Sequence, residues 1–290
     1  MNKALFGDCL ELMKDIPSGS IDMILCDLPY GTTQCKWDTV IPFCENINGV
    51  YFDEFIIDWF KSEKGIYADA LSHWAEYSED GLWENYNRII KENGAIVLFG
   101  SEPFSSALRM SNIKNYKYDW IWNKKKAGNF RAVKSMPLID YEKISVFNHD
   151  KSHYYPQMTK GKMRKKGGYY SPHEQPLNSG TKEKYNDEYY PKGILEYTKA
   201  NNVDSKLHPT QKPIPLMENL IKTYTNEGET VLDNCAGSFT TSIACLNTDR
   251  KYICMEQVQE YFDKGTARIA QWHKNKESEI EIKNNNLELF

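Results

Sequence analysis

The sequence has no long hydrophobic run. No segment approaches the roughly eighteen consecutive apolar residues that a helix needs to span a bilayer. The N-terminus also lacks an apolar stretch of the length found in secretory signals. We therefore expect an intracellular protein with no membrane partner.

Paired cysteines are also missing. None of the seven cysteines forms a C-x-x-C pair with another. An odd number of cysteines without metal-like spacing is typical of reduced, mostly buried thiols. We predict no metal site and no disulfide framework for Cys9, Cys26, Cys35, Cys44, Cys235, Cys245 and Cys254.

Glycine-rich phosphate-binding motifs are absent as well. Dinucleotide sites carry G-x-G-x-x-G, whose glycines let a pyrophosphate lie on a helix N-terminus, and P-loops end in G-K-[ST]. Neither pattern occurs in this chain. This absence argues against a nicotinamide oxidoreductase and favours a nucleoside ligand without a diphosphate, such as S-adenosylmethionine.

The chain has no overall excess of basic residues. Its formal net charge of −4 argues against a protein that coats nucleic acid without specificity. Phosphate contacts need only a local basic surface, and two basic stretches occur, at 124–134 and 160–166. Residues 44–81 are the opposite, with nine acidic residues against two lysines.

Apolar segments of strand length alternate with helical patterns along the chain. This alternation predicts an α/β fold, with a mostly parallel sheet and helices on both faces. The length of 290 residues suits one large domain with an inserted module. We expect strands at 21–27, 95–99, 118–122, 143–147, 229–233 and 251–256, and a frayed tail after Lys274.

Two segments interrupt the alternation. Residues 148–207 are rich in Tyr, Lys, Gly, Pro and Asn and are too long for an ordinary connection, which indicates an inserted module. We therefore divide the chain into 1–147, the insert 148–207, and 208–290. The acidic segment 44–81 is too apolar for a linker; a helical subunit interface and packing onto its own domain are equal alternatives.

A strand, a small-residue turn and a helix start follow one another between Val231 and Thr241. Such a turn lets the backbone approach a ligand at the carboxyl end of a parallel strand. Glu256 closes the next strand, where its carboxylate could accept hydrogen bonds from ribose hydroxyls. The alternative is that Gly237 merely ends a strand and Glu256 is a solvated surface acid.

The segment Asp27-Leu28-Pro29-Tyr30 directly follows a buried strand. A carboxylate and the Leu28 carbonyl, held by Pro29, could accept the two N–H bonds of a base's exocyclic amine and stabilise the positive charge that develops on it. Tyr30 offers an aromatic face for a base rotated out of a duplex. Taken alone, the segment could equally be a strand followed by a Pro-containing turn, with Tyr30 in the core.

Four motifs in order resemble the beta group of DNA amino-methyltransferases, in which the catalytic motif precedes the cofactor motif. Residues 27–30 resemble D-P-P-Y, and 233–241 resemble D-P-F-x-G-S-G-T-T. Residues 208–213 resemble the family's H-P-T-x-K-P motif. Residues 118–147 also resemble the family. The resemblance implies a Rossmann-like, circularly permuted methyltransferase sheet with an inserted target-recognition region.

This resemblance also implies roles for individual residues. Asp27, Leu28, Pro29 and Tyr30 would form the catalytic pocket. The residues expected to bind S-adenosylmethionine are Asp8 and Cys9 at its adenine, Glu256 at its ribose, and Asp233, Ala236, Gly237, Thr210 and Lys212 at its methionine part, together with Asp27 and Ser238.

Four positions depart from the family pattern. Leu28 replaces a proline, which leaves the carbonyl in place. Asn234 and Cys235 replace Pro and Phe in the cofactor motif. Phe239 replaces a glycine, which would reshape the cofactor loop or weaken its affinity for the cofactor. We still expect an active enzyme.

The segment 148–207 lies where this family carries its target-recognition region. A basic segment rich in Tyr and Asn suits phosphate contacts together with hydrogen bonds to base edges. A solvated loop is the alternative. The residues expected to contact double-stranded DNA are Lys124, Lys125, Arg131, Lys160, Lys162, Arg164, Lys165 and Lys166.

The resemblance predicts methyl transfer from S-adenosylmethionine to the N6 of a flipped-out adenine. Methylation of cytosine N4, RNA or a protein amide, and a catalytically silent DNA-binding module, are the alternatives. It further suggests the cytoplasm of a bacterial or phage-infected cell, a homodimer, and a restriction endonuclease partner in the same system.

Overall fold

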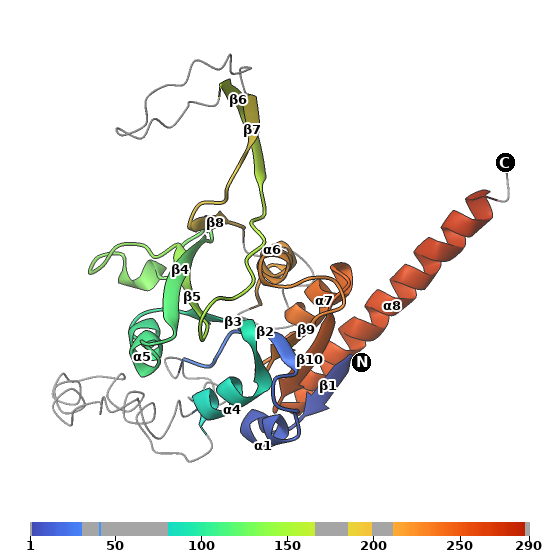
Figure 1. Ribbon diagram of the computed structural model, residues 1–290, viewed down its shortest axis with the longest axis horizontal. Coiled ribbons are helices and arrows are strands. Elements are labelled where there is room, and N and C mark those ends of the chain that lie inside the picture. Colours follow the sequence, from blue (N-terminus) through green and yellow to red (C-terminus); the bar gives the residue numbers. More distant parts are fainter. Residues whose placement is uncertain (1, 31–40, 42–80, 166–184, 199–210, 288–290) are drawn as a thin grey trace, which may run out of the picture.

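The computed structural model describes residues 2–30, 41, 81–165, 185–198 and 211–287 (Figure 1). The predicted 44–81 segment, apart from its last residue, lies outside the described residues, as do Thr210 and Lys166. Among the helices that the structure describes, none is long and apolar enough to cross a membrane.

An eight-stranded sheet forms the centre of the molecule. All neighbouring strands are parallel except at β5, which runs antiparallel to both of its neighbours. The predicted α/β fold with a mostly parallel sheet is confirmed. In order across the sheet, the strands are β1 (Lys3–Phe6), β10 (Lys251–Glu256), β9 (Thr230–Asp233), β2 (Ile21–Cys26), β3 (Ile90–Gly100), β5 (Tyr141–Phe147), β4 (Tyr116–Asn123) and β8 (Ile194–Glu196).

Helices cover both faces of this sheet. On one face, buried side chains of the sheet pack against α1 (Cys9–Lys14), α4 (Leu82–Ile89) and α5 (Phe104–Ser111) and form the first core cluster. A second cluster unites the other face with α6 (Ile214–Tyr224), α7 (Thr240–Asn247) and α8 (Gln259–Leu287). Successive strand residues point to opposite faces, so Ile24 of β2 joins the first cluster and Leu25 the second. Both side chains are fully buried, which explains why β2 is almost continuously apolar.

The end of the chain differs from the sequence prediction. We expected fraying after Lys274, but α8 continues to Leu287 and projects away from the body of the molecule (Figure 1). Pairs of opposite charge spaced by one turn, such as Lys276 with Glu279, support a solvated helix of this kind.

The inserted segment contributes to two sheets. Strands β6 (Thr159–Lys165) and β7 (Tyr185–Tyr189) form a separate antiparallel pair that extends from the body (Figure 1). Strand β8, by contrast, joins the central sheet beside β4. The segment 148–207, which we interpreted as an inserted module, thus also contributes residues 194–196 to the central sheet. Three residues are too few to show a periodicity that sequence reasoning could detect.

Candidate functional site

Acidic residues lie at the carboxyl ends of four neighbouring parallel strands. Glu256 ends β10 and Asp233 ends β9, while Asp8 and Asp27 come just after β1 and β2. The register aligns these ends, since Phe6 of β1 pairs with Glu256. Ligands of open α/β sheets bind at this edge, so the structure groups the predicted catalytic and cofactor residues in one place.

Both carboxylate oxygens of Asp27 accept hydrogen bonds. The hydroxyl of Tyr30 donates to Oδ1 at 2.6 Å, and the ammonium of Lys212 donates to Oδ2 at 2.5 Å. The ring of Tyr30 also packs against Phe104, with ring centroids 4.9 Å apart. Tyr30, three residues further along the chain, and Lys212, just before α6, thus hold Asp27 in one orientation.

Glu142 is a site residue that we did not predict. Its carboxylate lies 3.2 Å from the ammonium of Lys212 and 3.2 Å from that of Lys124. Charges therefore alternate from Asp27 through Lys212 and Glu142 to Lys124, and we call these four residues the charged cluster. A sequence signal did exist, because Glu142 is an acid in a strand whose following residues are mostly apolar.

The charges in this cluster stabilise one another. Burial raises the pKa of Asp27, and the neighbouring Lys212 opposes that shift. Burial disfavours the ammonium of Lys212, but the carboxylates of Asp27 and Glu142 raise its pKa overall. Burial likewise disfavours ionised Glu142, yet Lys212 and Lys124 lower its pKa. Each ion pair of the cluster therefore offsets part of the cost of burying its two members.

Lys124 differs from its predicted role. We expected it to face DNA phosphates, but it is buried and its ammonium bonds to Glu142. The prediction treated 124–134 as one exposed basic stretch, whereas Lys124 follows directly on β4 and packs inward. Lys125 is exposed and pairs with Glu196 at 2.6 Å, and Arg131 is exposed.

The small-residue turn between β9 and α7 is tied to its neighbours by backbone hydrogen bonds. The N–H of Ala236 donates to the carbonyl of Met255 at 2.8 Å, and the N–H of Gly237 donates to the Glu256 carboxylate at 2.8 Å. Gly237 has a φ of 51°, which a glycine adopts without strain. Ser238 is buried, with its hydroxyl 3.0 Å from that of Thr240.

Asp233, which begins this turn, and Glu256, which bonds to it, are both buried. The other Glu256 oxygen accepts from the N–H of Val258 at 2.8 Å, and burial raises its pKa. The alternative that Glu256 is a solvated surface acid is therefore wrong. Asp233 accepts from the Thr241 hydroxyl and the Cys235 N–H, and burial raises its pKa to about 6.

The start of α1 contacts the small-residue turn through Cys9, which is buried. Asp8 caps α1 by accepting from the N–H groups of Leu10 and Glu11. The Asn234 amide donates to the Cys9 sulfur at 3.5 Å, and its oxygen accepts from the Tyr86 hydroxyl at 2.6 Å. The asparagine that departs from the family pattern thus connects this turn to α1 and α4.

Phe239 also departs from the family pattern, and its side chain points into the core. It retains a left-handed φ of 58°, which the family's glycine would adopt more easily. Its fully buried ring packs on Phe262, with centroids 5.9 Å apart, and against Gly265. Gly265 provides the space, since a Cβ added there would lie 1.9 Å from the ring.

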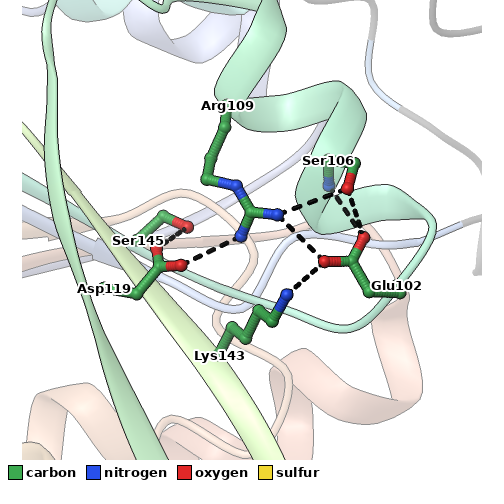
Figure 2. A network of polar contacts seen from close by, with 6 residues as sticks. All are labelled: Glu102, Ser106, Arg109, Asp119, Lys143 and Ser145. Atoms are coloured by element: carbon green, nitrogen blue, oxygen red, sulfur yellow. Dashed lines mark hydrogen bonds and ion pairs between the residues drawn. The ribbon is translucent and has the colours of Figure 1, made fainter.

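A polar network supports the aromatic partner of Tyr30 (Figure 2). Arg109 of α5 bonds to Glu102 at 2.9 Å and to Asp119 of β4 at 3.0 Å. Glu102 also bonds to Lys143 and to the Ser106 hydroxyl. These bonds tie the start of α5, where Phe104 lies, to β4 and β5. Burial opposes ionisation of Glu102, but Lys143, Ser106 and Arg109 lower its pKa to about 2.

Four of the five predicted DNA contacts on the insert lie in β6 and are exposed, and the fifth, Lys166, lies outside the described residues. All residues of β6 are exposed, including Lys160, Lys162, Arg164 and Lys165. The guanidinium of Arg164 lies 5.8 Å from the ring centre of Tyr189 on β7. No group of His, Cys, Asp or Glu within the described ranges could hold a metal ion.

Comparisons with known proteins identify the family of this chain. The family described as DNA methylase matches residues 21–268. The chain is 26% identical over 277 residues to the DNA adenine methyltransferase YhdJ of Escherichia coli, covering 91% of this chain and 81% of that protein. It is 25% identical over 284 residues to the type II methyltransferase M.HinfI of Haemophilus influenzae, covering 95% and 70%.

Solved structures share the fold. The M1.HpyAVI–SAM complex matches with a TM-score of 0.54 and 20% identity, covering 93% of this chain and 99% of that one. The PvuII DNA methyltransferase, described as cytosine-N4-specific, matches with a TM-score of 0.55 and 17% identity, covering 92% and 86%.

Proposed function

The chain belongs to the DNA methylase family, and on this premise we propose that it transfers a methyl group from S-adenosylmethionine to the N6 of an adenine in double-stranded DNA. The observation that carries the proposal is the position of Asp27. Asp27 follows β2 directly, and β2 pairs with β9. The small-residue turn predicted to bind the cofactor begins where β9 ends. The acceptor for an amine and the predicted cofactor site are therefore adjacent.

The acidic sheet edge suits S-adenosylmethionine chemically. When bound, this cofactor supplies an electrophilic methyl group on a positively charged sulfur. The buried carboxylates of Asp233 and Glu256 favour a cationic ligand, and Glu256 can accept bonds from ribose hydroxyls. We assign the predicted set to this role: Asp8, Cys9, Asp27, Thr210, Lys212, Asp233, Ala236, Gly237, Ser238 and Glu256. In the structure Lys212 bonds to Asp27, so it would have to share its protons with a cofactor carboxylate.

Asp27 compensates for the weak nucleophilicity of the adenine amine, whose lone pair is delocalised into the ring. Its carboxylate and the Leu28 carbonyl accept the two N–H bonds, which favours a pyramidal nitrogen and stabilises positive charge as it develops. Lys212 and Tyr30 hold the carboxylate before the substrate arrives, so little reorganisation is needed.

We propose that the target base flips out of the duplex and stacks on Tyr30. The ring packs on Phe104, and the base would stack on its opposite face. Stacking contributes roughly 1–3 kcal/mol and offsets part of the few kcal/mol that flipping costs. Contacts to the DNA backbone would come from Lys125 and Arg131 and from Lys160, Lys162, Arg164, Lys165 and Lys166.

The assembly and location of the protein remain predictions. A homodimer would use the segment 44–81, and a restriction endonuclease would act in the same system. The place of action would be the cytoplasm of a bacterial or phage-infected cell.

The test is to incubate the protein with genomic DNA and methyl-labelled S-adenosylmethionine and to separate the digested nucleosides. Label in N6-methyladenine is expected, and Asp27→Ala should abolish it. Label in N4-methylcytosine would keep the mechanism and correct the base. Cofactor binding without transfer to any of several unrelated DNAs would indicate RNA or protein substrates. Absence of cofactor binding would favour the silent DNA-binding module.

A further inference from the structure

The loop between β4 and β5 contains an ordered turn with separate apolar and basic edges. The turn is the 3-10 helix η1 (Phe130–Ala132) and the residues that follow it. Side chains three residues apart in such a turn lie on the same side. Phe130, Val133 and Met136 therefore form one edge, and Arg131 and Lys134 form the next.

The apolar edge faces solvent. Phe130 is 66% exposed, Val133 56% and Met136 43%, so three hydrophobic side chains lie outside the core. The turn is nevertheless well ordered. Asn129 donates to the Pro137 carbonyl at 2.9 Å and accepts from the Ile139 N–H at 2.7 Å, which closes the loop at its base. A stiff, exposed apolar edge of this kind is typical of a contact surface.

This loop begins and ends at the charged cluster. Lys124 precedes it and Glu142 follows it, and the two side chains bond to each other at 3.2 Å. Strand β3 is parallel to β2, and β5 is antiparallel to both β3 and β4. Strand β4 therefore runs in the same direction as β2. The loop therefore leaves the sheet at the same edge as Asp27.

The charge of the loop identifies its partner. Between Lys124 and β5 the only acidic residue is Asp140, next to the strand, and the charged residues nearest in sequence to the apolar edge are Arg131 and Lys134. In a two-fold dimer with this loop on its axis, Arg131 and Lys134 would meet their own equivalents. A polyanion instead complements them, and proteins that distort DNA insert apolar side chains between bases while basic residues hold the phosphates.

We propose that Phe130 and Val133 insert into the duplex at the position that the target base leaves when it flips out. There they contact the neighbouring bases, which have lost a stacking partner. Arg131 and Lys134 contact the adjacent phosphates. This inference rests on the proposed function and adds to it the residues that keep the duplex open.

The experiment compares two duplexes that carry the recognition site, mapped first by sequencing N6-methyladenine in cells expressing the protein. One duplex is fully paired. The other has an abasic site opposite the target adenine, so that the adenine needs no help to leave the stack. The variant is Phe130→Ala combined with Val133→Ala. Ile282→Ala removes a comparably exposed side chain from α8 and is the control.

We expect the double variant to lose about tenfold or more in kcat/KM on the paired duplex and to stay within about threefold of wild type on the abasic duplex. Phe130→Met, which keeps an apolar side chain, should retain most activity on both. Unchanged cofactor affinity and circular dichroism exclude misfolding. Equal losses on both duplexes, or no loss on either, would overturn the inference. If the wild-type protein methylates neither duplex, the proposed function itself fails.

Discussion

The ammonium of Lys212 lies 2.5 Å from the carboxylate of Asp27, although 185 residues separate the two in the chain. Lys212 comes from the segment predicted to bind cofactor, and Asp27 from the predicted catalytic motif. Their contact couples the two halves of the site, because the charge of one sets the pKa of the other.

Replacing Lys212 with Met should make Asp27 harder to ionise. The burial that raises the pKa of Asp27 would then act without its main opposing charge. The acid limb of the pH–kcat profile should move to higher pH. Breaking the buried pair should also lower the free energy of unfolding by roughly 3 kcal/mol. Urea unfolding measures this loss, and Lys212→Arg, which keeps the charge, is the control. An unshifted acid limb would contradict the assignment.

Replacing Glu142 with Gln should have the opposite effect on Asp27. The charge of Glu142 raises the pKa of Asp27, so its removal lets Lys212 act on Asp27 alone. The acid limb of the pH–kcat profile should therefore move to lower pH. A shift in the same direction for Glu142→Gln and Lys212→Met would show that the two residues do not act on Asp27 through charge.

Gly265 and Phe239 should behave as a matched pair. A methyl group at Gly265 would collide with the Phe239 ring, so Gly265→Ala should destabilise the protein by about 1–3 kcal/mol. Phe239→Gly would relieve the left-handed backbone but leave a cavity that costs about 3–5 kcal/mol.

In the double variant the new methyl group occupies part of that cavity. Its loss of stability should be smaller than the sum of the two single losses, as measured by a double-mutant cycle in urea. Additive losses would mean that the two positions do not share one space.

Glu102 should contribute to stability above its unfolded pKa and lose that contribution in acid. Its folded pKa is about 2, below the ordinary value of 4.5, so the contribution is present above about pH 4.5 and disappears as the pH falls toward 2. Thermal melting of the wild type should exceed that of Glu102→Gln at about pH 6, and the difference should vanish at acid pH. A difference independent of pH would exclude this ion pairing as the cause.

Local patterns in the sequence determined most of the architecture. A strand buried on both faces must be apolar throughout, so segments such as 21–27 and 251–256 were recognisable without knowledge of their neighbours. The motif around Asp27 and the turn at Gly237 lie at strand ends, where they follow from the same patterns. Their common position at one sheet edge follows because parallel strands end on the same side.

Only the tertiary structure decided how the charges pair. Lys124 and Lys125 are adjacent lysines in the sequence, yet one is buried against Glu142 and the other is exposed beside Glu196. Strand β8, the alternating cluster around Lys212, and the space that Gly265 leaves for Phe239 depend in the same way on residues far apart in the chain. Periodicity reports which face of an element is buried, whereas the partner across that face depends on strand order and register, which the packed chain alone determines.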